Sequence, residues 1–427
     1  MRILDIKGLQ ILDSRGNPTL QVDVILDEGS KGTFQVPSGA STGIHEACEL
    51  RDEDENNYHG KSVEKCLKNI ELIKEHFLDK EFTQEELDKK LILFDGSENK
   101  SVLGANTILG VSVAFAKASA KYYSLPTYEY INKLYLEENL SKTANTSKKQ
   151  IHLFSNVING GLHSGNNLQI QEFMLVPMQD SMQEKVKIIS ETYQTLKKLI
   201  KDKYGPSSTS LGDEGGFAPE ISKPSEALDL LVNAINTSGH QNNVGIAIDC
   251  AASDFYNSKT KKYKIEKNKN LDYKELTVYY NELVNKYPII AVEDPMAEDD
   301  FDGFSYYMKN KVTPNKKNIF SDKKELLVIG DDLLVTNPRR IQEAQKKKLC
   351  NSLLLKINQI GTLSESFDSA RLAQKKNWHI VVSHRSGETT DSFIADLAVA
   401  LSSSIKLGAP ARGERTAKFN RLLEIYR

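Results

Sequence analysis

Five short apolar runs in the second half of the chain, separated by helical patterns, constrain the fold more than any other feature. The runs are GIAID, PIIAVED, LLVIGDD, SLLLKI and WHIVVSH, and EFMLVP precedes them. Short buried strands that alternate with helices are typical of βαβ units and a parallel sheet. No GxGxxG follows any of these runs, which argues against an open dinucleotide-binding sheet. The pattern therefore predicts a closed (β/α)8 barrel.

The first third of the chain has a different pattern. TLQVDVIL and GTFQVP indicate strands of a small antiparallel sheet of three strands. Three helical patterns follow, one of which opens with a capping box at Thr83 and Glu86. The polar tract EENLSKTANTSKKQ, from Glu137 to Gln150, has no periodic apolar face. We therefore predict an N-terminal α+β domain over residues 1–137 and the barrel over residues 138–427.

Composition excludes several classes of partner. A formal net charge of -2 provides no basic field for nucleic acid or anionic lipid, so we expect neither a nucleic-acid nor a membrane partner. No run approaches the length of a membrane span, and MRILDIKGLQ has neither a signal nor a transit pattern, so we expect a cytoplasmic protein. The four cysteines are scattered without CxxC spacing, which predicts free thiols.

Three of the apolar runs end in a carboxylate. Asp249 closes GIAID, Glu293 lies in VED, and Asp331 begins the DD of VIGDD. In a parallel barrel the carboxyl ends of the strands converge on one face, where barrel enzymes keep their active sites. Each acid alone could be a helix N-cap. Three acids in successive units would repel one another unless a cation joined them, and oxygen ligands favour Mg²⁺. The spacing therefore predicts a metal site.

The next units carry cationic side chains instead. Lys356 interrupts the apolar run LLLKI, His384 lies in VSHRSGETTD, and Lys406 lies in SIKLG. Lys356 alone could belong to an edge strand and face water. Since the units continue the series of strand ends, we predict instead that these cations face the acids across one barrel mouth. A lysine in that setting has a tunable pKa and can serve as a base, and HRSG offers groups suited to a phosphate.

Longer motifs extend beyond these positions and occur in a familiar order. The chain resembles the enolase family in segments that cover nearly its whole length: ILDSRGNPT, VPSGASTG, NKSVLGAN, NGGLHSGN, QEFMLVP, LGDEGGFAP, AIDCAASDFY, VEDPMAEDDFDGF, GDDLLVTNP, LLLKINQIGT, VSHRSGET and GAPARGERTAKFN. Several of these segments are eight residues or longer, so agreement by chance is negligible.

The resemblance implies a lyase of glycolysis, a reversible dehydration of 2-phosphoglycerate to phosphoenolpyruvate with two Mg²⁺ per active site. It implies that Asp249, Glu293 and Asp331 hold the first Mg²⁺, and that Ser41 of SGAST helps to hold the second. Lys356 would be the base at C2, and Glu214 of GDEGG, assisted by Glu172 of QEF, the acid that releases the C3 hydroxyl. The substrate-binding set would be His163, Glu172, Lys356, His384, Arg385, Ser386 and Lys406.

Several positions depart from the family pattern. ADLAVALSSSIK is one residue shorter than expected before Lys406, so the reach of that lysine depends on the preceding helix. A glutamate and an arginine that pair across the family's dimer are replaced by Gln21 and Glu424. We expect a homodimer that lacks this ion pair. SGASTG is either a loop that closes over substrate or an ordinary turn.

Two alternative functions remain beside that of an enolase. A dehydrating or racemising relative of the same superfamily would carry K-x-K on an early barrel strand, whereas this chain has QIQEFMLVP. A binding protein on an enolase scaffold, such as a surface receptor for plasminogen, often uses a C-terminal lysine, whereas this chain ends in Arg427. All the expected catalytic positions are present, which favours the enzyme.

Overall fold

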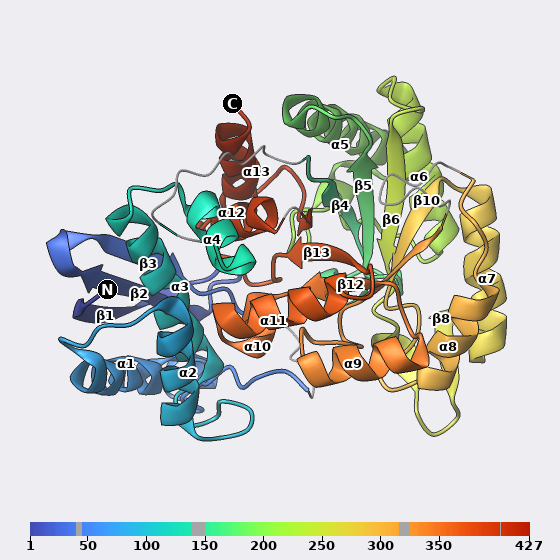
Figure 1. Ribbon diagram of the computed structural model, residues 1–427. Coiled ribbons are helices and arrows are strands. Elements are labelled where there is room, and N and C mark those ends of the chain that lie inside the picture. Colours follow the sequence, from blue (N-terminus) through green and yellow to red (C-terminus); the bar gives the residue numbers. More distant parts are fainter. Residues whose placement is uncertain (40–44, 139, 141–149, 316–324, 402) are drawn as a thin grey trace.

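The computed structural model consists of an N-terminal part built on an antiparallel sheet and a closed barrel beside it (Figure 1). The structure describes residues 1–39, 45–138, 140, 150–315, 325–401 and 403–427. Ser41 and most of the polar tract that we assign to the domain boundary lie outside the described residues, so both assignments stay predictions.

The N-terminal sheet has the predicted strands. β1 (Ile3–Leu12), β2 (Pro18–Leu26) and β3 (Lys31–Gln35) pair antiparallel in the order β1-β2-β3. Alternate residues of β2 are buried under helix α3 (Ala105–Tyr122), as the alternating pattern requires. Gly32 of β3 allows the close approach, because a Cβ atom there would lie 2.0 Å from the carbonyl oxygen of Ala114 on α3.

Three further α-helices lie among the described residues of this part of the molecule. They are α1 (Glu64–Phe77), α2 (Gln84–Asp95) and α4 (Thr127–Leu136). The predicted capping box begins α2, where the Thr83 side chain accepts from Glu86 N and the Glu86 side chain accepts from Thr83 N. Helix α3 is almost entirely buried, in keeping with its apolar sequence.

Eight strands close the barrel: β4 (Leu153–Asn159), β5 (Glu172–Pro177), β6 (Val244–Asp249), β10 (Ile289–Glu293), β11 (Leu327–Gly330), β12 (Ser352–Leu355), β13 (His379–Ser383) and β14 (Ser404–Leu407). The surrounding helices are α5 (Met182–Tyr204), α6 (Pro224–Thr237), α7 (Tyr273–Lys286), α8 (Phe301–Asn310), α9 (Pro338–Lys347), α11 (Leu363–Gln374), α12 (Phe393–Ala400) and α13 (Gly413–Ile425). A short helix, α10 (Ile357–Ile360), follows β12. The predicted barrel is confirmed, and inward side chains such as Phe154, Ile290 and Leu354 fill it.

One strand departs from the predicted parallel arrangement. β5 runs antiparallel to both of its neighbours, β4 and β6. The connection from β4 to β5 contains one short turn of helix, Gly161–His163, whereas a parallel return needs a long crossover. The chain therefore reverses, and the amino end of β5 lies at the mouth where the other strands have their carboxyl ends. Glu172, the first residue of β5, is placed there by this reversal.

A small antiparallel sheet, β7 (Tyr256–Asn257), β8 (Lys262–Glu266) and β9 (Lys269–Leu271), lies between β6 and α7 along the chain.

All four cysteines are free thiols, as predicted. Within the described ranges, no helix combines the length and the apolar character that crossing a bilayer requires.

The N-terminal part is bonded to the loop that follows β13. Ser38 N donates to Gly387 O (2.7 Å), and Gly387 N donates back to Ser38 O (3.0 Å). Ser14 N donates to Glu388 O (2.7 Å). Helices α2 and α4 pack on α11 and α12 of the barrel. The contacts hold the HRSGE segment at the barrel mouth between the two parts of the molecule.

Candidate active site

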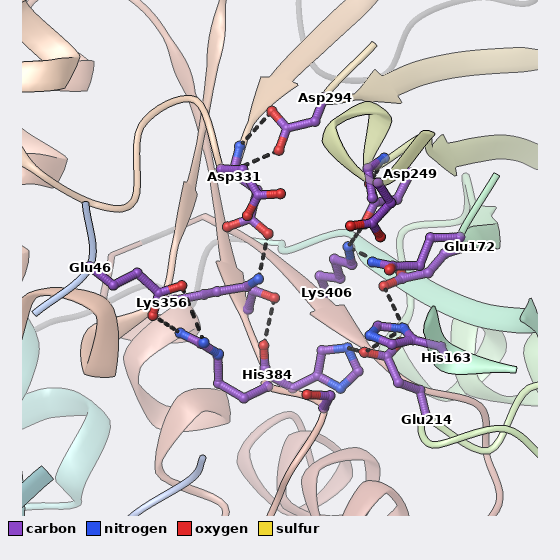
Figure 2. Close-up of a pocket in the computed structure, with 17 residues that line it drawn as sticks. Glu46, His163, Glu172, Glu214, Asp249, Asp294, Asp331, Lys356, His384 and Lys406 are labelled. Carbon is purple, nitrogen blue, oxygen red and sulfur yellow. Dashed lines mark hydrogen bonds and ion pairs between the residues drawn. The ribbon is translucent and has the colours of Figure 1, made fainter. Parts of the chain in front are cut away.

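A polar pocket opens at the barrel mouth, and most of the predicted site residues line it (Figure 2). Those that line it directly are His163, Glu172, Glu214, Asp249, Asp331, Lys356, His384, Arg385, Ser386 and Lys406. Glu293 joins them through an ion pair with Lys406. Positions separated by more than two hundred residues in sequence thus share one pocket, whereas Ser41 lies outside the described residues.

Lys406 lies at the centre of the acids. Its Nζ is 2.8 Å from Glu293 Oε1, 3.0 Å from Asp249 Oδ2 and 3.1 Å from Glu172 Oε2. Burial alone would lower the pKa of Lys406, but the three carboxylates outweigh it and raise this pKa well above its usual value. The shortened segment before β14 does not keep Lys406 from the pocket.

The three predicted metal ligands stand at the ends of β6, β10 and β11, which are neighbours in the barrel. Glu293 Oε2 is buried and has no hydrogen-bond partner in the described part of the chain. Burial and the charge of Asp249 raise the pKa of Glu293 well above its usual value. A hard divalent cation would bind the orphaned oxygen and relieve the repulsion, so this oxygen-only set fits Mg²⁺ in its chemistry.

The side chains of the three predicted metal ligands form ion pairs with lysine ammonium groups. Lys406 lies against Asp249 and Glu293, while Lys356 pairs with Asp331. Asp249, Glu293 and Asp331 do not form a trio of ligand atoms within 4.8 Å of one another in the described residues. The trios that do are His163 with Glu172 and Glu214, and Asp294 with Asp331 and Asp332.

Lys356 follows β12 directly, and its side chain is only 15% exposed. Its Nζ donates to Asp331 Oδ2, and its backbone N donates to Thr336 Oγ1 (2.9 Å). Burial would lower the pKa of Lys356, but the charge of Asp331 outweighs it and raises this pKa, against Arg385 and Lys406. An acid in the barrel mouth therefore accounts for a lysine in an apolar run.

A pair of glutamates occupies the side of the pocket opposite Lys356. Glu172 begins β5, four strands from β12 around the barrel. Glu214 Oε2 accepts from Asn156 Nδ2 on β4 (2.9 Å), and His163 Nδ1 lies 3.7 Å from one oxygen of each glutamate. His384 Nε2 lies 3.3 Å from Glu214 Oε1.

The environment separates the pKa values of these two glutamates. Burial and the charge of Glu214 raise the pKa of Glu172 well above its usual value. Burial also acts to raise the pKa of Glu214, but the imidazoles of His384 and His163 outweigh it and lower this pKa. Of the two glutamates, Glu172 is therefore the one whose environment favours the protonated form.

Two comparisons with known proteins agree with this geometry. The family model described as "Enolase, N-terminal domain" matches residues 3–131, and the one described as "Enolase, C-terminal TIM barrel domain" matches residues 151–427. The chain belongs to the enolase family. It is therefore an enzyme, a lyase, and the resemblance in its motifs is confirmed.

Curated relatives of the enolase family match over the full length. "Enolase 1" of Entamoeba histolytica is 46% identical over 443 residues, covering 100% of this chain and 96% of the relative. "Enolase B" of Dictyostelium discoideum is 47% identical over 438 residues, covering 100% and 94%. "Enolase" of Methanocaldococcus jannaschii is 46% identical over 427 residues, covering 99% and 94%.

In this member of the enolase family, Arg385 is paired with a residue that the sequence patterns did not indicate. Arg385 Nη1 lies 2.9 Å from Glu46 Oε2, and Nη2 lies 3.3 Å from Glu46 Oε1. Arg385 Nη1 also donates to Asn358 Oδ1 (3.0 Å). No periodic or strand-end pattern marks Glu46, because it belongs to the N-terminal part and meets the pocket only through the tertiary fold.

Asp294 is a second residue that the strand-end argument passed over. Its carboxylate accepts from Asp331 N (3.1 Å) and Asp332 N (2.6 Å), so it holds the backbone of a predicted metal ligand. Its φ of 37° is in the left-handed region that a non-glycine residue seldom adopts, and such strain is common at functional sites. The sequence signal that could have identified Asp294 is the pair of adjacent acids at each strand end, in VED and in GDD.

Proposed function

We propose that the chain catalyses the reversible dehydration of 2-phosphoglycerate to phosphoenolpyruvate. The placement of Lys356 and the Glu172–Glu214 pair on opposite sides of one pocket carries this proposal (Figure 2). Dehydration takes a proton from one carbon and a hydroxyl from the next, which calls for a base and an acid on two sides of the substrate.

The cationic side chains of the pocket can bind the two anionic groups of such a substrate, its phosphate and its carboxylate. Arg385 has a planar guanidinium that can bind phosphate through two parallel hydrogen bonds, and Ser386 and His384 lie beside it. Lys406 would face the substrate carboxylate, and His163 would line the side that holds Glu214. Substrate phosphate would compete with Glu46 for Arg385.

The proton transfers follow from the two sides of the pocket. Lys356 removes the C2 proton, and the electron pair of that C–H bond moves into the substrate carboxylate to give an enediolate. That pair then returns to form the C2–C3 double bond as the C3–O bond breaks, and the hydroxyl takes a proton from Glu214 and leaves as water. Glu172, whose environment favours the protonated form, donates a replacement proton to Glu214. Lys356 must be neutral to act; burial and the nearby cations Arg385 and Lys406 favour that form, while the charge of Asp331 outweighs them and keeps the pKa of Lys356 raised.

Asp249, Glu293 and Asp331 would hold the first of two Mg²⁺ ions, and Ser41 would help to hold the second together with the substrate phosphate. Bound Mg²⁺ would supply fixed positive charge where the enediolate develops and would take the charge of Asp331 away from Lys356. We further propose a place in glycolysis, a cytoplasmic location, a homodimer, and the two domains over residues 1–137 and 138–427.

The test is an assay of purified protein with 2-phosphoglycerate, following the ultraviolet absorbance of phosphoenolpyruvate. We expect product only when Mg²⁺ is present, and loss of activity with a chelator. Absence of turnover with Mg²⁺ would overturn the proposal, and binding of 2-phosphoglycerate without turnover would favour a binding protein on the same scaffold. Full turnover in metal-free buffer would refute the metal site alone.

A further inference from the structure

Arg415 is a buried arginine on α13 whose guanidinium reaches both loops beside the glutamate pair. Its Nη1 lies 2.8 Å from His384 Nδ1 and donates to Arg385 O (2.7 Å). Its Nη2 donates to Ser386 O (2.7 Å) and to Asp213 O (3.2 Å). One side chain thus joins the HRS segment after β13 to the residue that precedes Glu214.

Arg415 has a longer ion-pair contact than Arg421 on the same helix. Its Nε has no hydrogen-bond partner in the part of the chain that the structure describes, and the nearest ion-pair oxygen, Glu414 Oε1, is 3.6 Å away. Arg421, on the same helix, makes two short contacts with the Asp396 carboxylate, at 2.6 and 2.9 Å. Arg415 instead directs its donors at an imidazole and three carbonyl groups.

A guanidinium can only donate, so the contact fixes the chemistry of the ring. His384 Nδ1 must accept from Arg415, and the ring proton then resides on Nε2. That nitrogen lies 3.3 Å from Glu214 Oε1, the carboxylate of the proposed general acid, and it makes no hydrogen bond in the described part of the chain, so Glu214 is the acceptor next to its N–H. Burial, with a contribution from Arg415, lowers the pKa of His384 to about 4, which keeps the ring neutral at pH 7.

We infer that Arg415 is a positioning residue for the elimination step, because it holds His384 in the Nε2–H tautomer against Glu214. The inference rests on the proposed dehydration and assigns it a further residue. Without Arg415 the ring can present the lone pair of Nε2 to Glu214, which repels the carboxylate and displaces it from the leaving hydroxyl. Removal of the C2 proton by Lys356 does not depend on this contact.

The tautomer is tested without any substrate, by ¹⁵N NMR of protein labelled at the histidine rings. The His384 signals are assigned by their loss in His384→Gln. We expect a protonated Nε2 and an unprotonated Nδ1 in the unaltered protein, loss of this single pattern in Arg415→Met, and its retention in the control Arg421→Met. A protonated Nδ1 in the unaltered protein, or an unchanged pattern in Arg415→Met, would overturn the inference.

The catalytic consequence is tested by NMR of 2-phosphoglycerate in D2O, which reports deuterium at C2 and phosphoenolpyruvate together. We expect Arg415→Lys, which keeps the charge but not the fork of donors, to slow elimination about tenfold or more relative to exchange, with KM little changed. Arg421→Lys should keep the ratio of the unaltered protein.

Equal loss of exchange and elimination in Arg415→Lys would show a general structural role and overturn the inference. If the unaltered protein forms no phosphoenolpyruvate, the proposed function fails, while the ¹⁵N pattern still decides whether Arg415 sets the tautomer. If Arg415→Met does not fold, the ¹⁵N pattern of Arg415→Lys decides the same question, since the lysine keeps the charge and much of the side-chain volume.

Discussion

At the scale of single residues, Lys356 and Glu214 are held by separate partners, Asp331 for the lysine and Asn156 with His384 for the glutamate. Their roles can therefore be separated by mutation. Lys356→Ala should abolish both deuterium exchange at C2 and product formation. Glu214→Gln should still permit exchange, because the base remains, while elimination slows by roughly 10² to 10⁴. NMR of 2-phosphoglycerate in D2O measures both. Exchange that survives in Lys356→Ala would assign the base to another group.

Asp249 permits a test of the metal site against its simpler alternative. Its Oδ1 accepts from Ala251 N (3.0 Å), which is how a capping residue behaves, while its Oδ2 faces Lys406. If Asp249 binds Mg²⁺, Asp249→Asn should weaken Mg²⁺ binding by about tenfold or more, about 1.4 kcal/mol. Calorimetric titration with Mg²⁺ measures this, with Asp368→Asn on α11 as the control. Unchanged affinity would leave Asp249 as a cap alone.

The site could be predicted where residue type and strand position coincide. Asp249, Asp331, Lys356 and Lys406 all lie at or next to strand ends, where a charged residue stands out against an apolar run. Arg415 lies within a helix rich in charged residues, so its burial against His384 has no local signal. Its role depends on how α13 packs across the barrel mouth, which no short window of sequence contains.

At the scale of elements, the direction of β5 was the feature that the pattern did not determine. EFMLVP is buried throughout, so its side chains suit a barrel strand of either direction. The connection over residues 160–171 determines the direction of β5. It contains only one short turn of helix, Gly161–His163, whereas a connection to a parallel strand needs a longer crossover. The family motif QEF identified Glu172 without showing why the start of a strand reaches the mouth.

The packing of α3 on β3 gives a prediction at this same scale. Gly32→Ala should place a Cβ atom 2.0 Å from Ala114 O and 2.3 Å from Ala118 N, and both are backbone atoms that cannot rotate away. We expect a loss of unfolding free energy at or above the upper end of the roughly 1 to 3 kcal/mol typical of overpacking. Urea denaturation measures it.

The matched control for this substitution is Gly413→Ala. A Cβ atom at Gly413 meets nothing within 4 Å, and the backbone there does not have a positive φ. Alanine also favours helix over glycine, so stability should be equal or higher. A Gly32→Ala protein as stable as the Gly413→Ala protein would mean that α3 and the sheet can separate at little cost.

At the scale of the whole molecule, the far end of the barrel contains two histidines held neutral. His152 precedes β4, and His379 begins β13 with Nε2 2.8 Å from Ser404 Oγ. Burial lowers the pKa of His152 to about 4, with Lys185 contributing, and lowers that of His379 to about 3. In the unfolded chain both would titrate near the ordinary value of about 6.5.

Because these pKa values are depressed in the folded state, the stability linked to them is complete above about pH 6.5 and is lost as the pH falls toward 4. We expect each histidine to account for about 2 kcal/mol of the stability lost between pH 7.5 and 4.5. Denaturant titrations should show a shallower loss in His379→Gln than in the unaltered protein. The control His240→Gln, at a surface contact with Glu191, should keep the full loss. Equal slopes in all three proteins would contradict the prediction.

The last prediction concerns the proposed homodimer and the two positions at which this chain departs from its family. Gln21 accepts a hydrogen bond from Gln35 (3.0 Å), and Glu424 pairs with Arg421 of its own helix (3.2 Å), so neither offers the partner charge that the family's ion pair needs. The dimer should therefore be weaker than is usual in the family, though a surface ion pair contributes only about 0 to 1 kcal/mol.

Restoring the ion pair should strengthen the dimer by a similar amount. Sedimentation across nanomolar to micromolar concentrations should show tighter association for Gln21→Glu combined with Glu424→Arg. Gln21→Glu alone should associate more weakly than the unaltered chain, because it would face the glutamate at position 424 across the interface. Identical association in all three proteins would place the interface elsewhere. A fully active monomer at every concentration would refute the dimer and show that one chain carries the complete site.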